Sequence, residues 1–284
     1  MTVIFLTSGT SWTVPNDFSA VNTIAAIGAG GYGGDGSFGI IIGNIGPPYY
    51  LPIISSTGGC GGGGGAFASI SNITLTPGAS ISYQIGASSS STYGSYASGA
   101  NTYFLNTSTL FAQGGQAGTT ASFGLGGSST SCVGTIKYSG GNGASGFYFG
   151  NGVGVTPAAP GGGGGGAAGP NGNGGNAATA ATGSGSTGGA ADNGTVASAT
   201  NGTEYFNGTI YAGSGGGATS AFSGVGALPT PVPGLYGAGG AGAGNFDSSN
   251  YYFYSAKSSG SDGIIIITYV PLKPSGMNMP MLGM

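Results

Sequence analysis

Glycine occupies 68 of the 284 positions in this chain, and its placement constrains the fold more than any other feature. Glycine loses more backbone entropy on folding than any other residue and brings no side chain to bury. Its blocks nevertheless begin where short apolar runs end, as in residues 22–36 and 58–75. This pattern indicates a chain in which backbone atoms, rather than large side chains, fill much of the interior. Such packing is typical of a structural or binding protein rather than an enzyme.

Charged residues are scarce: the chain has three lysines and six acidic residues, and it has no arginine or histidine. Nucleic-acid binding needs several phosphate-neutralising cations on one face, so scattered lysines exclude that class of partner. Disordered chains combine low hydrophobicity with high net charge. Here 39% of residues are hydrophobic and the net charge is only −3, so we expect an ordered fold.

Catalytic and metal-binding motifs are absent from the sequence. Without histidine there is no Ser–His or Cys–His nucleophile pair and no imidazole metal ligand. Residues 28–33 match the spacing of a dinucleotide-binding loop, but neither a helix pattern nor an acidic residue follows at the required distance. The carboxylates are scattered singly, so no glycosidase pair is indicated. We therefore expect no enzyme activity, no catalytic residues, no cofactor and no metal.

Targeting and membrane signals are also missing. The apolar runs fall far short of the roughly 20 residues that a membrane-spanning helix needs. The N-terminus has no basic region, so we expect no signal peptide and synthesis in a cytoplasm. Cytoplasmic synthesis favours free thiols at Cys60 and Cys132, although a disulfide between them stays open.

Short runs rich in β-branched and aromatic residues, bounded by glycine, proline or serine, predict strands. No stretch has a helical apolar period, and the first and last runs look like strands of one sheet. We therefore predict an all-β fold: a β-sandwich or jelly-roll-like core with long glycine-rich loops, in one domain over residues 1–270. The predicted strands are residues 2–7, 22–27, 66–75, 80–86, 101–106, 109–113, 135–139, 208–213 and 263–270.

Glycine recurs at every third position in three runs, residues 163–175, 30–39 and 140–146. Three residues per turn is the period of the polyproline-II helix, which has no internal hydrogen bonds and must pair its backbone with neighbours or water. Two interpretations remain open: packed polyglycine-II-type helices or irregular loops. The Gly/Ala/Asn-rich region near 140–200 is in turn either an ordered insertion or a linker.

Several tyrosines lie in segments whose glycine and proline content predicts loops. Tyrosine offers a flat apolar face and a hydroxyl, which suits stacking on a sugar or on a partner protein. The alternative is that these rings fill a core or a subunit interface. The candidate receptor or partner contacts are Tyr49, Tyr50, Tyr148, Tyr251, Tyr252 and Tyr254.

Residues 271–284 form a tail rich in methionine and proline. Pro271 and Pro274 end the last strand, because proline donates no hydrogen bond to a sheet. Flexible methionine side chains adapt to irregular grooves. We expect this tail to dock into a neighbouring subunit or an anchoring protein; the alternative is a frayed terminus. Its candidate docking residues are Met277, Met279, Met281 and Met284.

The order of these pieces resembles the glycine-rich domain of bacteriophage tail fibre and other virion surface proteins. The resemblance is carried by "SGTSWTVP" (8–15), "GAGG" (28–31), the unit "GGGGGAFASISNITLTPGASISYQIGA" (61–87), the pair "NTYFL" and "LFAQGG" within 101–115, and "GSDGIIIITY" (260–269). It extends over nearly the whole chain.

The resemblance implies a non-enzymatic virion structural protein, made in the host cytoplasm and placed on the virion surface. A tail fibre or adhesin would bind a host-surface glycan or protein; a capsid decoration or head fibre protein is the alternative. A glycine-rich ice-binding protein is a further and more remote alternative. Self-association would stabilise a glycine framework with few side chains to bury, and analogy with viral fibres implies a homotrimer.

Overall fold

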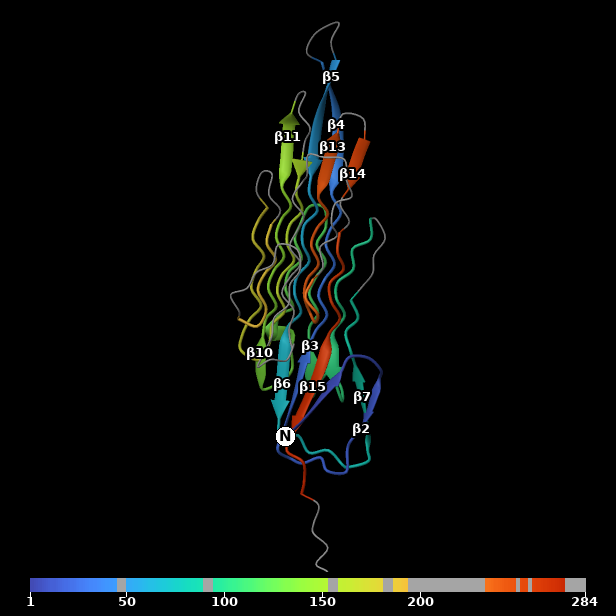
Figure 1. Cartoon of the computed structure of the whole chain (residues 1–284), viewed down its shortest axis with the longest axis vertical. Helices are drawn as coiled ribbons and strands as arrows, with labels where there is room; N and C mark the ends of the chain where they lie inside the picture. The colour runs from blue at the N-terminus through green and yellow to red at the C-terminus, as the bar shows by residue number, and fades with distance from the viewer. Residues whose placement is uncertain are drawn as a thin grey trace, which may run out of the picture.

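The computed structural model describes residues 1–44, 50–88, 94–152, 158–180, 186–193, 233–248, 251–254 and 257–273. The molecule is elongated, with a β-sandwich at one end, extended glycine-rich segments in the middle and a second group of strands at the other end (Figure 1). The described residues contain no α-helix, only the short 3-10 turn η1 (Ser129–Ser131). The prediction of an all-β fold is confirmed.

The sandwich consists of two antiparallel sheets. The first and last described strands, β1 and β15, pair directly, as the sequence predicted. The five-stranded sheet has the order β1 (Thr2–Leu6), β15 (Ile264–Tyr269), β3 (Asn22–Ile27), β6 (Phe67–Ser71) and β10 (Ile136–Tyr138). The four-stranded sheet has the order β2 (Ser11–Thr13), β7 (Ser80–Gln84), β8 (Thr102–Phe104) and β9 (Leu110–Ala112).

Alternating side chains of these strands form the core between the two sheets. Ile24 of β3 and Ile267 of β15 are fully buried from one side, and Phe104 of β8 is fully buried from the other. The Trp12 ring stands edge-on to Phe18 with 5.8 Å between centroids. This apolar core anchors one end of the glycine-rich segments.

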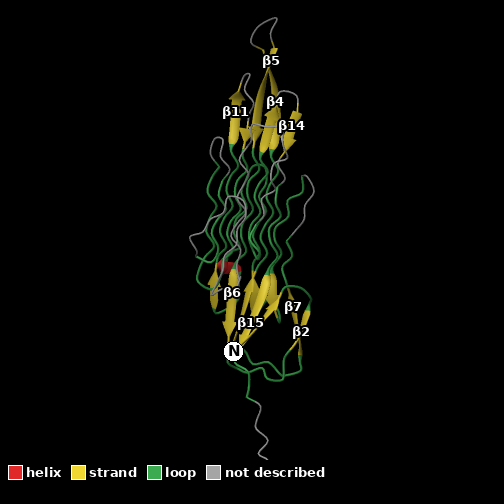
Figure 2. Ribbon diagram, viewed as in Figure 1, coloured by secondary structure: helices red, strands yellow, loops and turns green. Residues whose placement is uncertain are grey.

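Glycine-rich segments run side by side between the two groups of strands, where Figure 2 draws them as loops. Segment 58–66 has the clearest hydrogen-bond pattern. Its backbone N–H groups donate in strict rotation to segments 141–147, 237–243 and 113–119, so that each neighbour is met at every third residue. The distances along this segment run from 2.7 Å at Gly59 to 3.0 Å at Cys60. This is the three-residue period of polyglycine II, and we call the assembly of segments the glycine bundle.

Close approach of neighbouring backbones explains why the contacting positions are glycine. A Cβ atom on Gly64 would lie 2.0 Å from the carbonyl oxygen of Gly166, and one on Gly33 would lie 1.8 Å from that of Ala241. These neighbours are backbone atoms, which cannot rotate away. Most glycines of the bundle are therefore required by space, not by an unusual backbone conformation.

Asparagine side chains take over where a backbone N–H at the rim of the bundle has no neighbouring carbonyl. Asn142 Oδ1 accepts from Gly126 N at 2.9 Å, and Asn176 Oδ1 accepts from Asn142 N at 2.8 Å. Asn173 Oδ1 accepts in the same way from Ser139 N. The asparagine content of the low-complexity region thus satisfies backbone donors that would otherwise need another segment.

Two of the three glycine runs do not form single uninterrupted helices. The run from Gly163 turns back at Gly169 and Gly172, which bond to each other, because a turn at Pro170 and Asn171 separates two antiparallel bundle segments. The run of residues 30–39 passes into a strand at Ser37. The described parts of region 140–200 otherwise belong largely to the bundle and are hydrogen-bonded within it, so they do not form a linker. The predicted strand 208–213 lies outside the described residues.

The packing of the bundle predicts that two glycine-to-alanine substitutions differ strongly in how far they destabilise the fold. Gly64→Ala should destabilise the fold by about 3 kcal/mol or more, because the clash is with backbone. In Gly175→Ala the added methyl meets its nearest atom, Ala190 N, at 3.1 Å, and a small shift relieves it. Thermal unfolding followed by circular dichroism measures both. Equal melting temperatures for the two variants would contradict the close-packed bundle.

Candidate functional site

Six of the described strands lie at the end of the molecule opposite the sandwich, and we call them the distal strands (Figure 1). They make two three-stranded sheets, and β12 and β13 of one sheet contact β5 of the other. Several continue bundle segments directly, so the bundle sets their positions. The sheets have the orders β11 (Tyr148–Gly152), β5 (Tyr50–Thr57), β4 (Ser37–Asn44) and β12 (Ala158–Ala159), β13 (Asn245–Ser248), β14 (Tyr251–Tyr254).

The described tyrosines of the segments predicted as loops lie in strands, so for them that interpretation was wrong. Glycine and proline in these segments suggested loops, whereas antiparallel pairing with β4, β5 and β13 holds them extended. Aromatic residues suit a paired strand, so their β-propensity was the better guide. The structure brings Tyr50, Tyr148, Tyr251, Tyr252 and Tyr254 to the same end of the molecule; Tyr49 lies outside the described residues.

Strand register separates these tyrosines by their distance from the bundle. Tyr50 pairs with Asn44, and Tyr251 pairs with Ser248, at the ends of their hairpins farthest from the bundle. Tyr148 pairs with Thr57 beside the bundle, and Tyr148 is 62% exposed. The candidate residues thus divide into an outer group, which includes Tyr50 and Tyr251, and a position at the junction.

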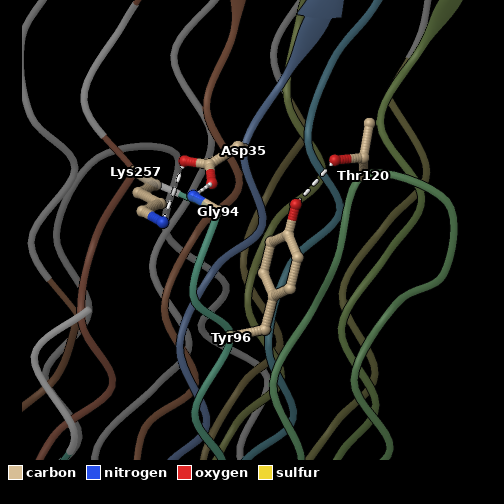
Figure 3. Close-up of polar contacts among 5 residues, drawn as sticks. All are labelled: Asp35, Gly94, Tyr96, Thr120 and Lys257. Atoms are coloured by element: carbon tan, nitrogen blue, oxygen red, sulfur yellow. Dashed lines mark hydrogen bonds and ion pairs between the residues drawn. The ribbon is translucent and has the colours of Figure 1, made fainter. Parts of the chain in front are cut away.

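A buried ion pair lies at the junction between the bundle and β4 (Figure 3). Lys257 Nζ is 2.9 Å from Asp35 Oδ1, and both side chains are less than a tenth exposed. The second carboxylate oxygen of Asp35 accepts a 2.8 Å hydrogen bond from Gly94 N. Since Asp35 lies just before β4, these contacts tie three distant chain segments together where the distal strands begin.

Two tyrosine rings lie close to the ammonium group of Lys257. Lys257 Nζ lies 4.8 Å from the centroid of the Tyr32 ring and 5.6 Å from that of Tyr96. The Tyr96 hydroxyl is in turn 2.8 Å from Thr120 Oγ1 (Figure 3). Aromatic faces stabilise a cation that is withdrawn from water. Sequence reasoning missed this cluster, because its members are far apart in the chain and only the rarity of charge marked them.

A double-mutant cycle at Asp35 and Lys257 should give a large interaction energy between the two side chains. Asp35→Asn should destabilise the fold by roughly 3–5 kcal/mol, because it leaves Lys257 charged, buried and without its anion. Asp35→Asn combined with Lys257→Met should recover part of that loss, since no charge stays buried. Chemical denaturation of the single and double variants gives the coupling. Additive losses would contradict a direct interaction.

The described residues gather no set of side chains that could hold a metal ion. No group of three or more His, Cys, Asp or Glu side chains comes together among them. Cys60 and Cys132 are free thiols, one in the bundle and one in the sandwich core, and burial raises the pKa of each. They therefore stay protonated at neutral pH and are poor nucleophiles. Within the described ranges, no helix is suited to crossing a membrane.

The last described residues of the chain are hydrogen-bonded beside the sandwich. Val270 N donates to Val21 O at 3.0 Å, and Leu272 N donates to Asp17 O at 2.7 Å. The N-terminus lies at this same end of the molecule (Figure 1). The candidate docking residues Met277, Met279, Met281 and Met284 lie outside the described residues.

No protein-family model matches the chain, and no curated protein matches it either.

Proposed function

We propose that this chain is a non-enzymatic structural protein of a bacteriophage virion, acting as a tail fibre or adhesin that binds the host surface. One observation carries the proposal: the two described ends of the chain meet at the sandwich, whereas the tyrosine-bearing distal strands lie at the opposite end. Such a division gives the molecule one end for attachment and another for recognition. The protein would be made in the host cytoplasm and carried on the virion surface.

The glycine bundle supports this division of roles. Its segments are hydrogen-bonded to several neighbours along their length, so the distal strands sit on a laterally braced spacer. A recognition surface gains affinity when it is rigid before binding, because less conformational freedom is lost. Tyrosines on such a support suit stacking on glycan rings or packing against a surface protein.

Self-association is part of the proposal. Ordered glycine costs entropy that a second copy would help to offset by burying more surface. The number of copies, a trimer, rests on the resemblance to viral fibres alone. Another virion protein is the proposed partner of the tail.

A capsid decoration or head fibre protein is the alternative, since an attachment end and a free end suit that position equally well. Immunogold labelling or cryo-electron microscopy of particles carrying the protein separates the two. Label at the tail supports the fibre, label over the head supports decoration, and particles without label contradict both. Hydrolysis of host-surface polysaccharide by the purified protein would overturn the non-enzymatic proposal.

Binding to host cells should depend on the outer tyrosines. We expect Tyr50→Ala combined with Tyr251→Ala to weaken binding of the fluorescently labelled protein at least about tenfold, as expected when two aromatic anchors are lost. Ile136→Ala removes an exposed apolar side chain at the sandwich end and should leave binding unchanged. Flow cytometry on susceptible bacteria measures both. Equal binding by both variants would exclude the outer tyrosines as contacts.

Removal of residues 275–284 should weaken virion incorporation while leaving the melting temperature unchanged, because the sandwich core lies upstream of this segment. A full-length control with serine replacing Met277, Met279, Met281 and Met284 separates the loss of apolar groups from the loss of length. Quantitative blotting of purified particles gives the incorporated amount. Normal incorporation of the truncated protein would show that the tail is not an anchor.

A further inference from the structure

One pass of the chain joins the distal strands to the sandwich. Strand β14 lies among the distal strands, residues 257–263 belong to the glycine bundle, and β15 is the second strand of the five-stranded sheet. The chain keeps one direction from residue 257 to the end of β15, along the long axis of the molecule (Figure 1). We call residues 257–272 the axial segment.

Backbone hydrogen bonds hold the axial segment extended within the bundle. Ser258 and Ser261, three residues apart, each donate to one neighbouring segment and accept from another. The four bonds are Ser258 N to Ala241 O at 3.0 Å, Ser261 N to Ala238 O at 2.9 Å, Gly33 N to Ser258 O at 3.1 Å and Gly30 N to Ser261 O at 2.9 Å. Their spacing is three residues on each of the three segments, which is the polyglycine-II period. The axial segment therefore has the same extended backbone as the rest of the bundle.

In the sandwich, β15 holds the axial segment extended from both sides. It pairs with β3 from Ile264 to Tyr269 and with β1 from Ile265 to Tyr269. Ile264 and Ile265 are fully buried. Beyond the strand, the backbone hydrogen bonds of Val270 and Leu272 continue the attachment. Sliding this strand out would load both ladders at once, because antiparallel hydrogen bonds lie across the direction of sliding.

The buried ion pair fixes the other end of the axial segment. Lys257 is the first residue of this segment, and Asp35 belongs to a bundle segment that passes into β4. Strand β14 ends shortly before Lys257, at Tyr254, and residues 255 and 256 lie outside the described residues. The axial segment is thus held at both ends, and candidate contact tyrosines precede it closely in the chain.

An extended backbone leaves this pass of the chain almost no length to gain. A polyglycine-II helix rises about 3.1 Å per residue and a strand about 3.3 Å, whereas a fully stretched chain reaches about 3.6 Å. Over the roughly 20 residues between Tyr251 and Leu272, complete stretching adds about 10 Å. Residues 255 and 256 can add at most about 7 Å more. Unfolding elsewhere in the molecule cannot change this limit, because the covalent chain between the two residues sets it.

We propose that the axial segment carries tension from the distal strands to the attachment end. This inference rests on the proposed function, in which a host surface is bound at one end of the molecule and the virion at the other. A pull on β14 then passes along covalent bonds to Leu272, and no non-covalent contact has to break. The lateral hydrogen bonds and the ion pair keep the segment aligned with the long axis, so the molecule keeps its length under load.

The other outer tyrosine lacks this direct connection. From Tyr50 the chain runs through β5 and residues 58–66 to β6, which lies far before Leu272 in the sequence. A pull on Tyr50 reaches β15 across the pairing of β6 with β3 and of β3 with β15. These contacts are non-covalent, and their failure frees a long stretch of chain. Of the two outer tyrosines, Tyr251 is therefore the contact that transmits a load without unfolding.

Single-molecule force spectroscopy with two pairs of cysteine handles tests this role. Tyr251→Cys combined with Leu272→Cys places the handles at the two ends of the pass. Tyr50→Cys combined with Leu272→Cys is the matched control, because it uses an outer tyrosine position and the same lower handle. The natural thiols, Cys60 and Cys132, are buried and do not compete for the handles during brief labelling.

Circular dichroism melts confirm that each protein is folded, and Tyr252→Cys supplies a second upper handle on β14. We expect the β14 handles to separate by less than about 20 Å, without steps, up to the force at which a handle detaches. The Tyr50 handle should give steps that add up to roughly 600 Å, because about 220 residues lie between it and the lower handle.

The measurement uses no host cell or virion, so its failure is separate from a failure of the proposed function, which the labelling and binding experiments test. Steps from the β14 handles, or an extension well beyond about 20 Å, would overturn the proposal. So would a Tyr50 handle that gives no step at the same force, because non-covalent contacts would then carry the load equally well.

Discussion

Lateral hydrogen bonding between glycine backbones is the interaction on which the rest of this structure depends. An extended segment with three residues per turn bonds nothing within itself, so each buried N–H and C=O must find a partner on a neighbour. Segment 58–66 meets this requirement with three neighbours in rotation. A buried backbone group left without a partner costs about 1–3 kcal/mol, so the segments are stable as a set and not singly.

The same constraint explains the unusual composition. Glycine stands where two backbones meet, since a Cβ on Gly61 would lie 1.8 Å from the carbonyl oxygen of Gly163. Asparagine stands at the rim, where Asn101 Oδ1 accepts from Gly114 N at 3.0 Å in place of a carbonyl. Charge is scarce because a close-packed backbone bundle offers it few sites. Where two opposite charges are buried together, at Asp35 and Lys257, a backbone N–H and two aromatic faces also stabilise them.

The sequence predicted the sandwich well, because strand alternation and turn residues are local. The first and last predicted strands were expected to share one sheet, and β1 and β15 pair directly. The sequence did not predict the distal strands. Strand β4 contains Gly39 and Gly43, and β5 contains Pro52, and these residues locally indicate loops. Pairing partners override those local preferences. The ion pair at the junction depends on segments that only the folded bundle brings together.

The period of three also limits how such a chain can change. Inserting one residue into a bundle segment would rotate every later glycine by about a third of a turn. Side chains would then face neighbours that leave room only for hydrogen, and donors would lose their carbonyls. Insertions of three residues keep the faces aligned but lengthen one segment against its neighbours. The distal strands are free of this restriction, since their register is set by pairing within small sheets. The bundle therefore fixes where the distal strands begin, whereas their register is set by pairing among themselves.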